Sequence, residues 1–237
     1  MAALQQSSLR NQLLAGLSPK DFAPLRPHLE PVALDLRRVL IEPHEPIEHV
    51  YFHERGYTSI TTNGQGNKIE LGLIGREGMV GVPVALGVRT TPLQFFVQLA
   101  GDGLRMTSHE LEEVIDEPPS LHRVLLRYAQ VISVQTSGTA FANAEHTMER
   151  RLARWLLMCH DRVDGDDIAI THEFMAMMLG VRRAGVTTAT QVLESSGLID
   201  AKRGVITVRD RKGLEELADN AYGLPEAEYA RLMAEGC

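Results

Sequence analysis

Residues 171–199 read THEFMAMMLGVRRAGVTTATQVLESSGLI, and this stretch decides the fold of the C-terminal part of the chain. Thr171 is suited to cap a short helix, and Glu173 lies in the first turn, where a carboxylate is favoured. Gly180 is suited to the left-handed position that ends a helix. A second helix is expected from about Arg182 to Gly197. The first helix is expected to bury Phe174, Met177 and Met178.

The second predicted helix has an apolar side and a polar side. Val186, Ala189 and Leu193 have the spacing of a buried face. The residues expected to point away from that face are Arg182, Arg183, Gly185, Thr187, Thr188 and Gln191. Residues 200–204 read as a basic turn, and 205–208 as a strand. Two helices joined at a glycine, followed by a turn and a strand, indicate a winged helix-turn-helix.

Such a helix can read bases in the major groove of double-stranded DNA, which is the partner this pattern predicts. Arginine can bond guanine, glutamine can bond adenine, and threonine can offer a hydroxyl or contact a thymine methyl. Lys202 and Arg203, in the predicted wing, are expected to bind phosphates, which position a protein without reading sequence.

Charge is unevenly distributed along the chain. The whole sequence has a net charge of −7, yet residues 180–212 contain seven cationic and three acidic side chains. This segment therefore carries +4 and the remainder −11. A local basic patch on an acidic protein suits a DNA-reading module, because phosphates respond to the local field. A solvated basic surface is the alternative interpretation.

The N-terminal half is rich in short β-branched or aromatic runs separated by Gly, Pro and charged residues. Asn63–Asn67 and Gly101–Gly103 read as turns. Strands are expected at 32–36, 39–41, 50–52, 57–62, 68–74, 95–99 and 104–106. Many short strands with Gly-rich turns favour a barrel or a jelly-roll-like sandwich. Short helices are expected from Ser18 to about Leu25 and from Ser108 to about Asp116.

A long helix is expected after Ser120. Its residues form a heptad seam for about three repeats, which suggests a coiled-coil contact in a homodimer. The seam consists of Leu121, Leu125, Tyr128, Ile132, Gln135, Thr139 and Ala142. The alternative is a long core helix packed within one chain.

Thr147 is expected to cap the next helix. One face of that helix is expected to be buried through Leu152, Trp155, Leu156 and Cys159, with Arg150, Arg151 and Arg154 on the other faces. Residues 168–170 form a possible short strand after it.

These parts, in this order, resemble the Crp–Fnr family of transcription regulators from Leu13 to about Leu217. The most specific matches are Arg150–Leu157 and Thr171–Ile199, and Leu14–Ser18 matches the family's entry segment. The resemblance implies an α+β chain, with a double-stranded β-helix (a jelly-roll-like β-roll) as sensor domain at 1–117. It also implies a dimerisation helix at 118–146, a winged helix-turn-helix at 147–237 and possible contact with RNA polymerase.

The resemblance also bears on individual positions. Thr171 and His172 fall where the family contacts phosphates. Ala184 and Thr188 stand where members with known half-sites often carry Glu and Arg, so their operator sequences cannot be transferred.

The sensor region departs further from the cyclic-nucleotide-binding members. Gly81-Val82 replaces their Gly-Glu pair, and Thr90-Thr91 replaces their Arg-Ser or Arg-Thr pair, with Arg89 one residue away. The cysteine cluster of the oxygen-sensing members is also missing. We therefore expect no cofactor and no control by cyclic AMP, and the effector stays unknown.

Two other functional classes are alternatives to a DNA-binding regulator. A metal-dependent cupin-like enzyme could use polar residues near one strand, although they lack the usual His-x-His pair: His44, Glu45, Glu48, His49, His53 and Glu54. Solvated loop residues are the simpler interpretation. A ligand-binding scaffold that has lost DNA binding is disfavoured by the Arg182-Arg183 pair and the basic wing. No catalytic or metal-ligating set is predicted, so we expect no enzyme.

The remaining features concern location. No run reaches the roughly 18 apolar residues of a membrane helix, and no secretory signal is visible at the start. The two cysteines, Cys159 and Cys237, make a disulfide framework unlikely, and Cys159 is expected to be a buried small apolar residue. We therefore expect a cytoplasmic protein without a membrane partner.

Overall fold

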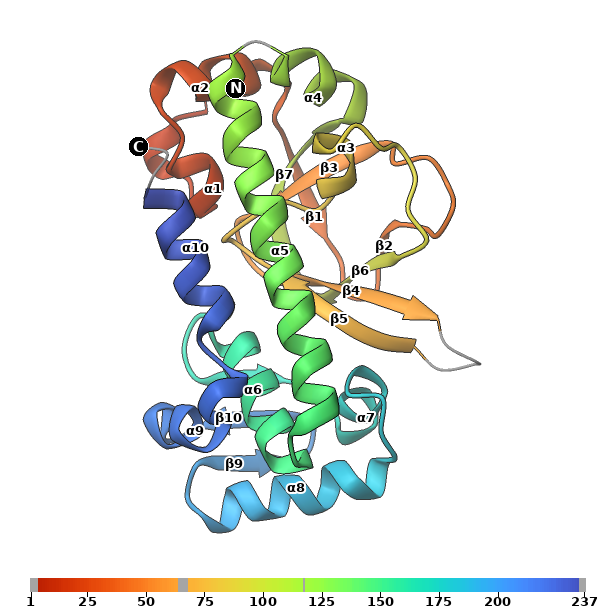
Figure 1. Ribbon diagram of the computed structural model, residues 1–237, viewed down its shortest axis with the longest axis vertical. Helices are drawn as coiled ribbons and strands as arrows, with labels where there is room; N and C mark the ends of the chain where they lie inside the picture. The colour runs from red at the N-terminus through yellow and green to blue at the C-terminus, as the bar shows by residue number, and fades with distance from the viewer. Residues whose placement is uncertain (1–3, 64–67, 117, 235–237) are drawn as a thin grey trace. The chain divides into compact units, whose positions relative to one another are not determined.

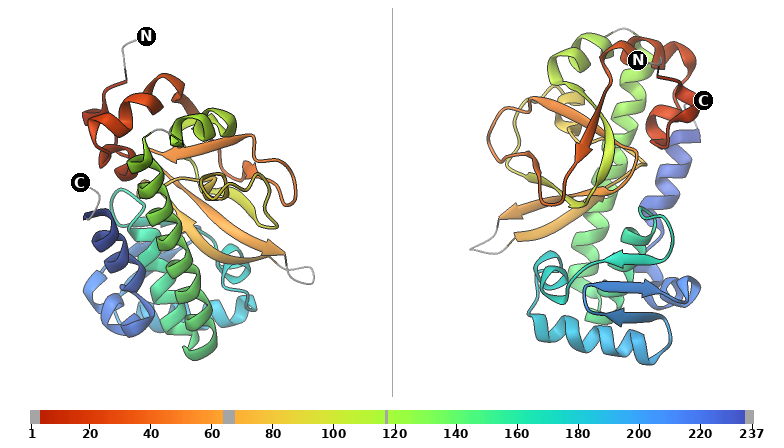
Figure 2. Two further views of the ribbon diagram at one scale, coloured as in Figure 1. Left: turned by 45° about the horizontal axis from the view of Figure 1, so that its top comes forward. Right: turned by 180° about the vertical axis from the view of Figure 1, so that it is seen from behind.

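The computed structural model describes residues 4–63, 68–116 and 118–234 (Figures 1 and 2). The chain divides into two compact units. The first comprises residues 1–60, 74–133 and 226–237, and the second comprises 61–73 and 134–225. These units differ from the predicted division at 117 and 146, because the long helix and one β-hairpin are each shared between them.

Two sheets contain the N-terminal strands. The first has the order β1 (Glu30–Leu34), β7 (Gly101–Thr107), β3 (His49–His53). The second has the order β2 (Val39–Ile41), β6 (Gln94–Leu99), β4 (Tyr57–Asn63), β5 (Lys68–Ile74). This arrangement confirms the predicted jelly-roll-like β-roll. Residues 64–67 of the predicted turn lie outside the described residues.

The turn predicted at Gly101–Gly103 is wrong, because these residues begin strand β7. Leu34 pairs with Gly101 and Val32 with Gly103. A Cβ at Gly101 would lie 2.1 Å from the carbonyl oxygen of Arg55, and a Cβ at Gly103 would lie 2.3 Å from that of Phe52. Glycine is thus required here by the close approach of a neighbouring backbone.

Strand β1 also begins and ends two residues earlier than predicted. Arg37 adopts a left-handed φ of 68°, so the chain turns where the predicted strand would end.

Short helices accompany the sheets in the first unit. They are η1 (Gln6–Ser8), α1 (Gln12–Ala15), α2 (Pro19–Leu25), η2 (Arg26–His28), α3 (Val82–Ala85) and α4 (Ser108–Ile115). Helix α2 lies where a helix is predicted, and Ser18 caps it, since its side chain accepts from the Asp21 N–H. Thr107, rather than Ser108, caps α4 in a capping box with Glu110.

The seam predicted to contact a second chain lies on helix α5 (Pro119–Glu145), but it packs within the chain itself. Five of the seven seam residues are buried within a single chain: Leu121, Leu125, Tyr128, Gln135 and Ala142. Tyr128 packs where Gly78 lacks a side chain, and Gln135 exchanges hydrogen bonds with the backbone of Leu73. Ile132 and Thr139 are only partly buried. The seam therefore faces the chain's own core, which was the alternative interpretation.

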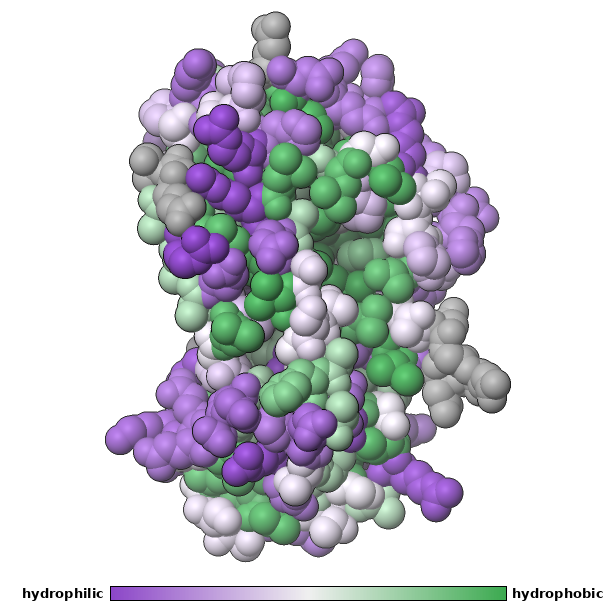
Figure 3. All heavy atoms as spheres, viewed as in Figure 1, coloured by the Kyte–Doolittle hydropathy of each residue, from purple (hydrophilic) through white to green (hydrophobic). Residues whose placement is uncertain are grey.

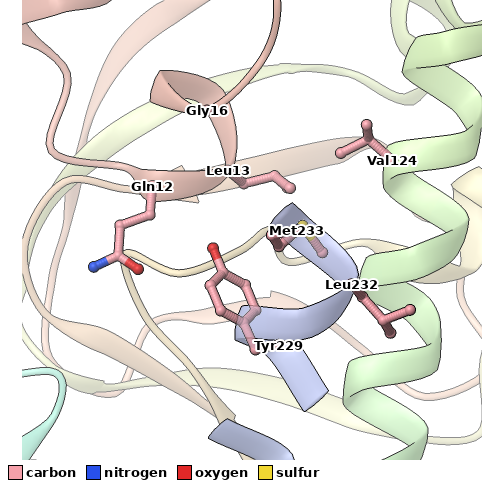
Figure 4. A pocket seen from close by; sticks show the side chains of 7 residues that line it. All are labelled: Gln12, Leu13, Gly16, Val124, Tyr229, Leu232 and Met233. Atoms are coloured by element: carbon pink, nitrogen blue, oxygen red, sulfur yellow. The ribbon is translucent and has the colours of Figure 1, made fainter. Parts of the chain in front are cut away.

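The last helix, α10 (Leu224–Ala234), ends beside α1 in the first unit. Figure 4 shows a small pocket of about 70 Å³ there, where Tyr229 and Met233 of α10 lie near Gln12 and Leu13 of α1. Val124 of α5 also lines it. Burial raises the pKa of the Tyr229 phenol, and the nearby Glu77 carboxylate acts in the same direction. The pocket is mostly apolar, as expected of a packing gap between helices.

The second unit is built around α6 (Met148–His160). Every residue of α6 from Leu152 to Cys159 is buried, so the prediction of a single buried face is too narrow. Arg154 is buried, so the prediction that it lies on an outer face of the helix is wrong. Its guanidinium donates to the carbonyl oxygens of Ala221 and Gln135 and to the Thr139 hydroxyl. These bonds allow a buried cation.

A hydrogen bond joins α6 to strand β5. Trp155 Nε1 donates to Glu70 Oε1 of β5 at 2.6 Å. The remaining elements are β8 (Asp167–Ala169), α7 (His172–Met178), α8 (Arg183–Ser195), β9 (Ile199–Lys202), β10 (Val205–Val208), α9 (Arg211–Ala218) and η3 (Asp219–Ala221). The three strands form an antiparallel sheet in the order β8-β10-β9.

Candidate nucleic-acid interface

Helix α7 opens the candidate interface and begins as predicted. The Thr171 hydroxyl accepts from the Phe174 N–H at 3.2 Å. The buried residues are Met175, Ala176 and Met178, whereas Met177 is exposed and Phe174 is half-buried. The predicted buried face is therefore wrong except at Met178. Met175, Met178 and Leu179 have the same i, i+3, i+4 spacing as the predicted trio, so spacing could not distinguish the two faces.

Gly180 makes the turn to the second helix in the predicted way. Its φ is 64°, a left-handed conformation that glycine adopts without strain. The Val181 N–H donates back to the Ala176 carbonyl oxygen at 3.0 Å, and Arg151 Nη2 donates to that of Leu179 at 2.6 Å. These bonds satisfy carbonyl groups that the end of α7 leaves open.

Helix α8 divides into the two predicted sides. Val186, Ala189 and Leu193 are fully buried, and Arg182 precedes the helix as its N-cap residue with an extended backbone. The exposed residues include Arg182, Arg183, Thr188 and Gln191, while Gly185 and Thr187 are half-buried. A Cβ added at Gly185 would meet nothing within 4 Å. The chain itself therefore gives no steric reason for glycine at this position.

The hydroxyls of α8 are largely engaged by the helix itself. Thr187 Oγ1 donates to the Arg183 carbonyl oxygen and Thr188 Oγ1 to that of Ala184, both at 3.1 Å. Each hydroxyl has a single proton, so neither threonine can donate to a base while these bonds last. Thr187 also meets the ring of the residue at the start of α7, since His172 Nδ1 lies 3.2 Å from its Oγ1.

The wing follows α8 and has a shorter turn than predicted. Strands β9 and β10 pair with each other, with Asp200 opposite Thr207 and Lys202 opposite Val205. Only Arg203 and Gly204 remain in the turn between them. Gly204 has a φ of 80°. The predicted turn at 200–204 is thus wrong for residues 200–202, which are strand residues. The Ala201 N–H donates to Glu194 Oε1 at 3.1 Å and joins the wing to the end of α8.

A groove of about 500 Å³ lies between the start of α7, helix α8 and the wing. It brings together seven of the predicted site residues: Thr171, His172, Arg183, Thr187, Gln191, Lys202 and Arg203. Gly185 and Thr188 on α8, and Arg182 at its N-cap, lie outside the lining of the groove. Glu173, Glu194 and Thr190 also line the groove and were not predicted. Thr190 and Glu194 follow Thr187 at helical spacing, which could have identified them.

Ion pairing separates the seven cations of residues 180–212, the basic segment, into two groups. Arg209 Nε donates to Asp200, Arg211 pairs with Asp161 and Glu215, and Lys212 lies near Glu216. Arg182, Arg183, Lys202 and Arg203 are all exposed, and none has an ion pair among the described residues. Four cations on α8 and the wing are thus available to an anionic partner.

The polar cluster considered for a metal has other contacts. Glu54 accepts from the N–H groups of Arg10 and Asn11. His53 is fully buried, and its Nε2 lies 2.8 Å from Thr58 Oγ1. In the described part of the chain, no three His, Cys, Asp or Glu side chains are grouped as metal ligands. Cys159 is buried, as predicted, and Cys237 lies outside the described residues.

No helix in residues 4–63, 68–116 and 118–234 is both long and apolar enough to span a bilayer.

Comparison with known proteins agrees with this geometry. Residues 150–217 match the family model of the Crp-like helix-turn-helix domain. No curated protein sequence matches the chain.

Several solved structures share the fold. FixK2 from Bradyrhizobium japonicum is 16% identical, with a TM-score of 0.70 over 81% of this chain and 98% of that chain. A CRP/FNR family regulator from Thermus thermophilus is 23% identical, with a TM-score of 0.65 over 80% and 98%. The c-di-GMP-responsive global regulator CLP from Xanthomonas campestris is 15% identical, with a TM-score of 0.65 over 81% and 99%. Residues 150–217 therefore correspond to a Crp-like helix-turn-helix domain, and the chain has the fold of solved Crp/Fnr-type transcriptional regulators.

Proposed function

We propose that this protein is a homodimeric, sequence-specific DNA-binding transcription regulator and has no catalytic activity. The observation that carries the proposal is the set of four exposed, unpaired cations on α8 and the wing in the described structure: Arg182, Arg183, Lys202 and Arg203. Cations that have no partner within the chain are available to DNA phosphates and base edges. A regulator of this kind acts on the chromosome, so we place it in the cytoplasm, where RNA polymerase is a possible partner.

Each group then has a distinct role. Helix α8 would enter the major groove, with Arg182 and Arg183 on guanines and Gln191 on adenine. The back-bonded hydroxyls of Thr187 and Thr188 favour methyl contacts with thymine over donated hydrogen bonds. Lys202 and Arg203 would bind phosphates and so fix the position of α8. The open space at Gly185 would allow the DNA backbone or a base to approach the helix closely.

The homodimer would form through the side of α5 that the chain leaves exposed. Leu126 is 41% exposed, and Ser133, Ser137, Ala140 and Ala144 share its side of the helix at intervals of three, four and seven residues. Figure 3 shows weakly polar side chains, drawn nearly white, over the middle of α5, with apolar ones beside them. Small side chains let two helices approach closely. Two copies of α8 would then reach successive major grooves about 34 Å apart.

The sensor residues do not suit a cyclic nucleotide. Val82 is apolar and buried, so it cannot accept a ribose hydroxyl. Arg89, one residue from the expected phosphate position, is held by both carboxylate oxygens of Glu112. Thr91 Oγ1 accepts from the Leu93 N–H. We therefore propose that cyclic AMP is not the effector and that no cofactor is needed for DNA binding.

Selection of bound duplexes from a random library tests the proposal, with purified protein at fixed salt and no added ligand. The expected product is a near-palindrome with half-sites about one helical turn apart. Replacing Arg182 and Arg183 together by Ala should remove the preference for that sequence, by about 1–3 kcal/mol for each lost bidentate contact.

The matched control is the double variant K202A/R203A in the wing. It should weaken binding to all duplexes alike and lower the salt dependence, because phosphate contacts carry no sequence information. Unchanged selectivity after loss of Arg182 and Arg183 would contradict the assignment of α8 as the reading helix.

A further inference from the structure

The side chain of His172 connects the two helices of the helix-turn-helix. His172 is the first residue of α7, and its Nδ1 lies 3.2 Å from Oγ1 of Thr187, the fifth residue of α8. That hydroxyl also donates to the Arg183 carbonyl oxygen at 3.1 Å. Three groups on two helices thus form one short hydrogen-bonded chain.

The protons of this chain can be assigned from the chemistry of its members. A carbonyl oxygen can only accept, so the single hydroxyl proton of Thr187 is used in the bond to Arg183. The hydroxyl oxygen can then only accept from the imidazole. Both bonds are satisfied together only when His172 Nδ1 carries a hydrogen. A neutral ring in this tautomer has no hydrogen on Nε2, which is then an acceptor.

His172 also lines the groove between α7, α8 and the wing. Nε2 has no hydrogen-bond partner among the residues that the structure describes. The charged groups lining the same groove are Glu173 on α7, Arg183 and Glu194 on α8, and Lys202 and Arg203 on the wing. An anion held there by the three cations would face Nε2. A neutral Nε2 would present a lone pair to it, whereas a protonated Nε2 would donate a hydrogen bond.

We propose that His172 binds a DNA phosphate only as the imidazolium, because Thr187 holds the hydrogen of the neutral ring on Nδ1. This inference rests on the proposed function and adds proton-linked control of affinity to it. Phosphate binding at Nε2 takes up a proton whenever the free ring is neutral. Affinity for DNA therefore falls as the pH rises and the imidazole loses its charge.

The test uses the full-length protein and a fluorescein-labelled duplex of mixed sequence at low salt, because a phosphate contact does not depend on sequence. The dissociation constant is measured by fluorescence anisotropy at about pH 6 and about pH 8. The ratio of the two constants is compared among variants, so that losses independent of pH cancel. Between about pH 6 and about pH 8, the affinity of the wild type should fall about tenfold more than that of H172Q. The glutamine amide of H172Q donates a hydrogen bond at both pH values.

Three further variants sharpen the test. H109Q removes a histidine that is 72% exposed on α4 in the first unit, and it should keep the wild-type ratio. T187V removes the acceptor on α8 and frees the neutral ring to carry its hydrogen on Nε2, so the ratio should shrink toward that of H172Q. T187S restores the hydroxyl and should restore the wild-type ratio. A role of His172 in packing alone would not respond to the Thr187 hydroxyl in this way.

The outcomes separate this inference from the proposed function. If the wild type binds the duplex and has the same pH ratio as H172Q, the inference is overturned and DNA binding stands. If T187V keeps the full wild-type ratio, the role of Thr187 is overturned. Absence of any salt-sensitive binding at about pH 6 would instead contradict the proposed function itself.

Discussion

Replacing Gly78 by Ala should destabilise the first unit, because a methyl group has no space at this position. A Cβ built on Gly78 would lie 1.8 Å from Cζ and 1.9 Å from Oη of Tyr128, far inside van der Waals contact. Tyr128 cannot move aside at low cost, since its side chain is fully buried. The same residue belongs to the seam predicted from sequence to contact a second chain. The substitution therefore tests which way that side of α5 faces.

The magnitude follows from the cost of overpacking. Forcing an extra methyl into a filled core costs about 1–3 kcal/mol, and the overlap here places G78A toward the upper end. Y128L removes ring atoms from a buried site and should cost about 2–4 kcal/mol by itself. In the double variant G78A/Y128L the shorter leucine leaves space for the new methyl. The double variant should therefore lose about 2 kcal/mol less than the sum of the single losses.

Chemical unfolding of the four proteins at one fixed protein concentration measures this coupling. The matched control is G138A, the same substitution on α5 itself, where the added Cβ would meet Arg154 only at 3.5 Å. G138A should be neutral or stabilising by up to about 1 kcal/mol, because alanine favours the helix. Additive losses for G78A and Y128L, within about 0.5 kcal/mol, would refute the packing of Tyr128 on Gly78. A lower oligomeric mass for Y128L, without loss of stability, would favour the seam predicted from sequence.

Two further predictions concern the dimer and acid stability. In sedimentation velocity, L126E should be a monomer instead of a dimer. The control L36E changes a leucine in the N-terminal β-roll that is 58% exposed, and it should remain dimeric. A dimeric L126E would exclude this side of α5 as the interface. Burial lowers the pKa of His53 to about 4, so the unfolded chain binds a proton on this residue near pH 6.5 that the folded chain does not. Stability is then fully present above about pH 6.5 and is lost toward about pH 4, at up to about 1.4 kcal/mol per pH unit. Unfolding midpoints at about pH 7 and pH 5 should differ less for H53Q than for the wild type, and equal differences would contradict this role of His53.

The helix-turn-helix could be predicted closely because its signals are local. The Thr171 cap, the left-handed Gly180 and the inward spacing of Val186, Ala189 and Leu193 each depend on a few neighbouring residues. Local rules of capping and backbone conformation determine such features. The register of the buried face of α7 failed because two overlapping trios had the same spacing. Only the packing against the rest of the unit selects Met175 over Phe174.

The seam on α5 failed for a different reason. A heptad of apolar residues records that one side of a helix is buried, but it does not record what buries it. A second copy of the helix and the chain's own sheets remove the same apolar area from water, so both favour the same residue types. Gly78 and the backbone of Leu73, which receive Tyr128 and Gln135, are each more than 40 residues away in sequence. Contacts over such separations leave no periodic signal in the helix that makes them.

The charge of the basic segment shows how structure changes the meaning of a count. Sequence gives residues 180–212 a charge of +4, in which all seven cations weigh equally. In the structure Arg209, Arg211 and Lys212 lie beside carboxylates, and a surface ion pair presents little net field to a distant phosphate. The other four cations stand on α8 and the wing, where Glu173 and Glu194 are the nearby carboxylates of the groove lining. An acidic protein can therefore bind DNA through this surface, because the phosphates respond to the charges they approach and not to the sum over the chain.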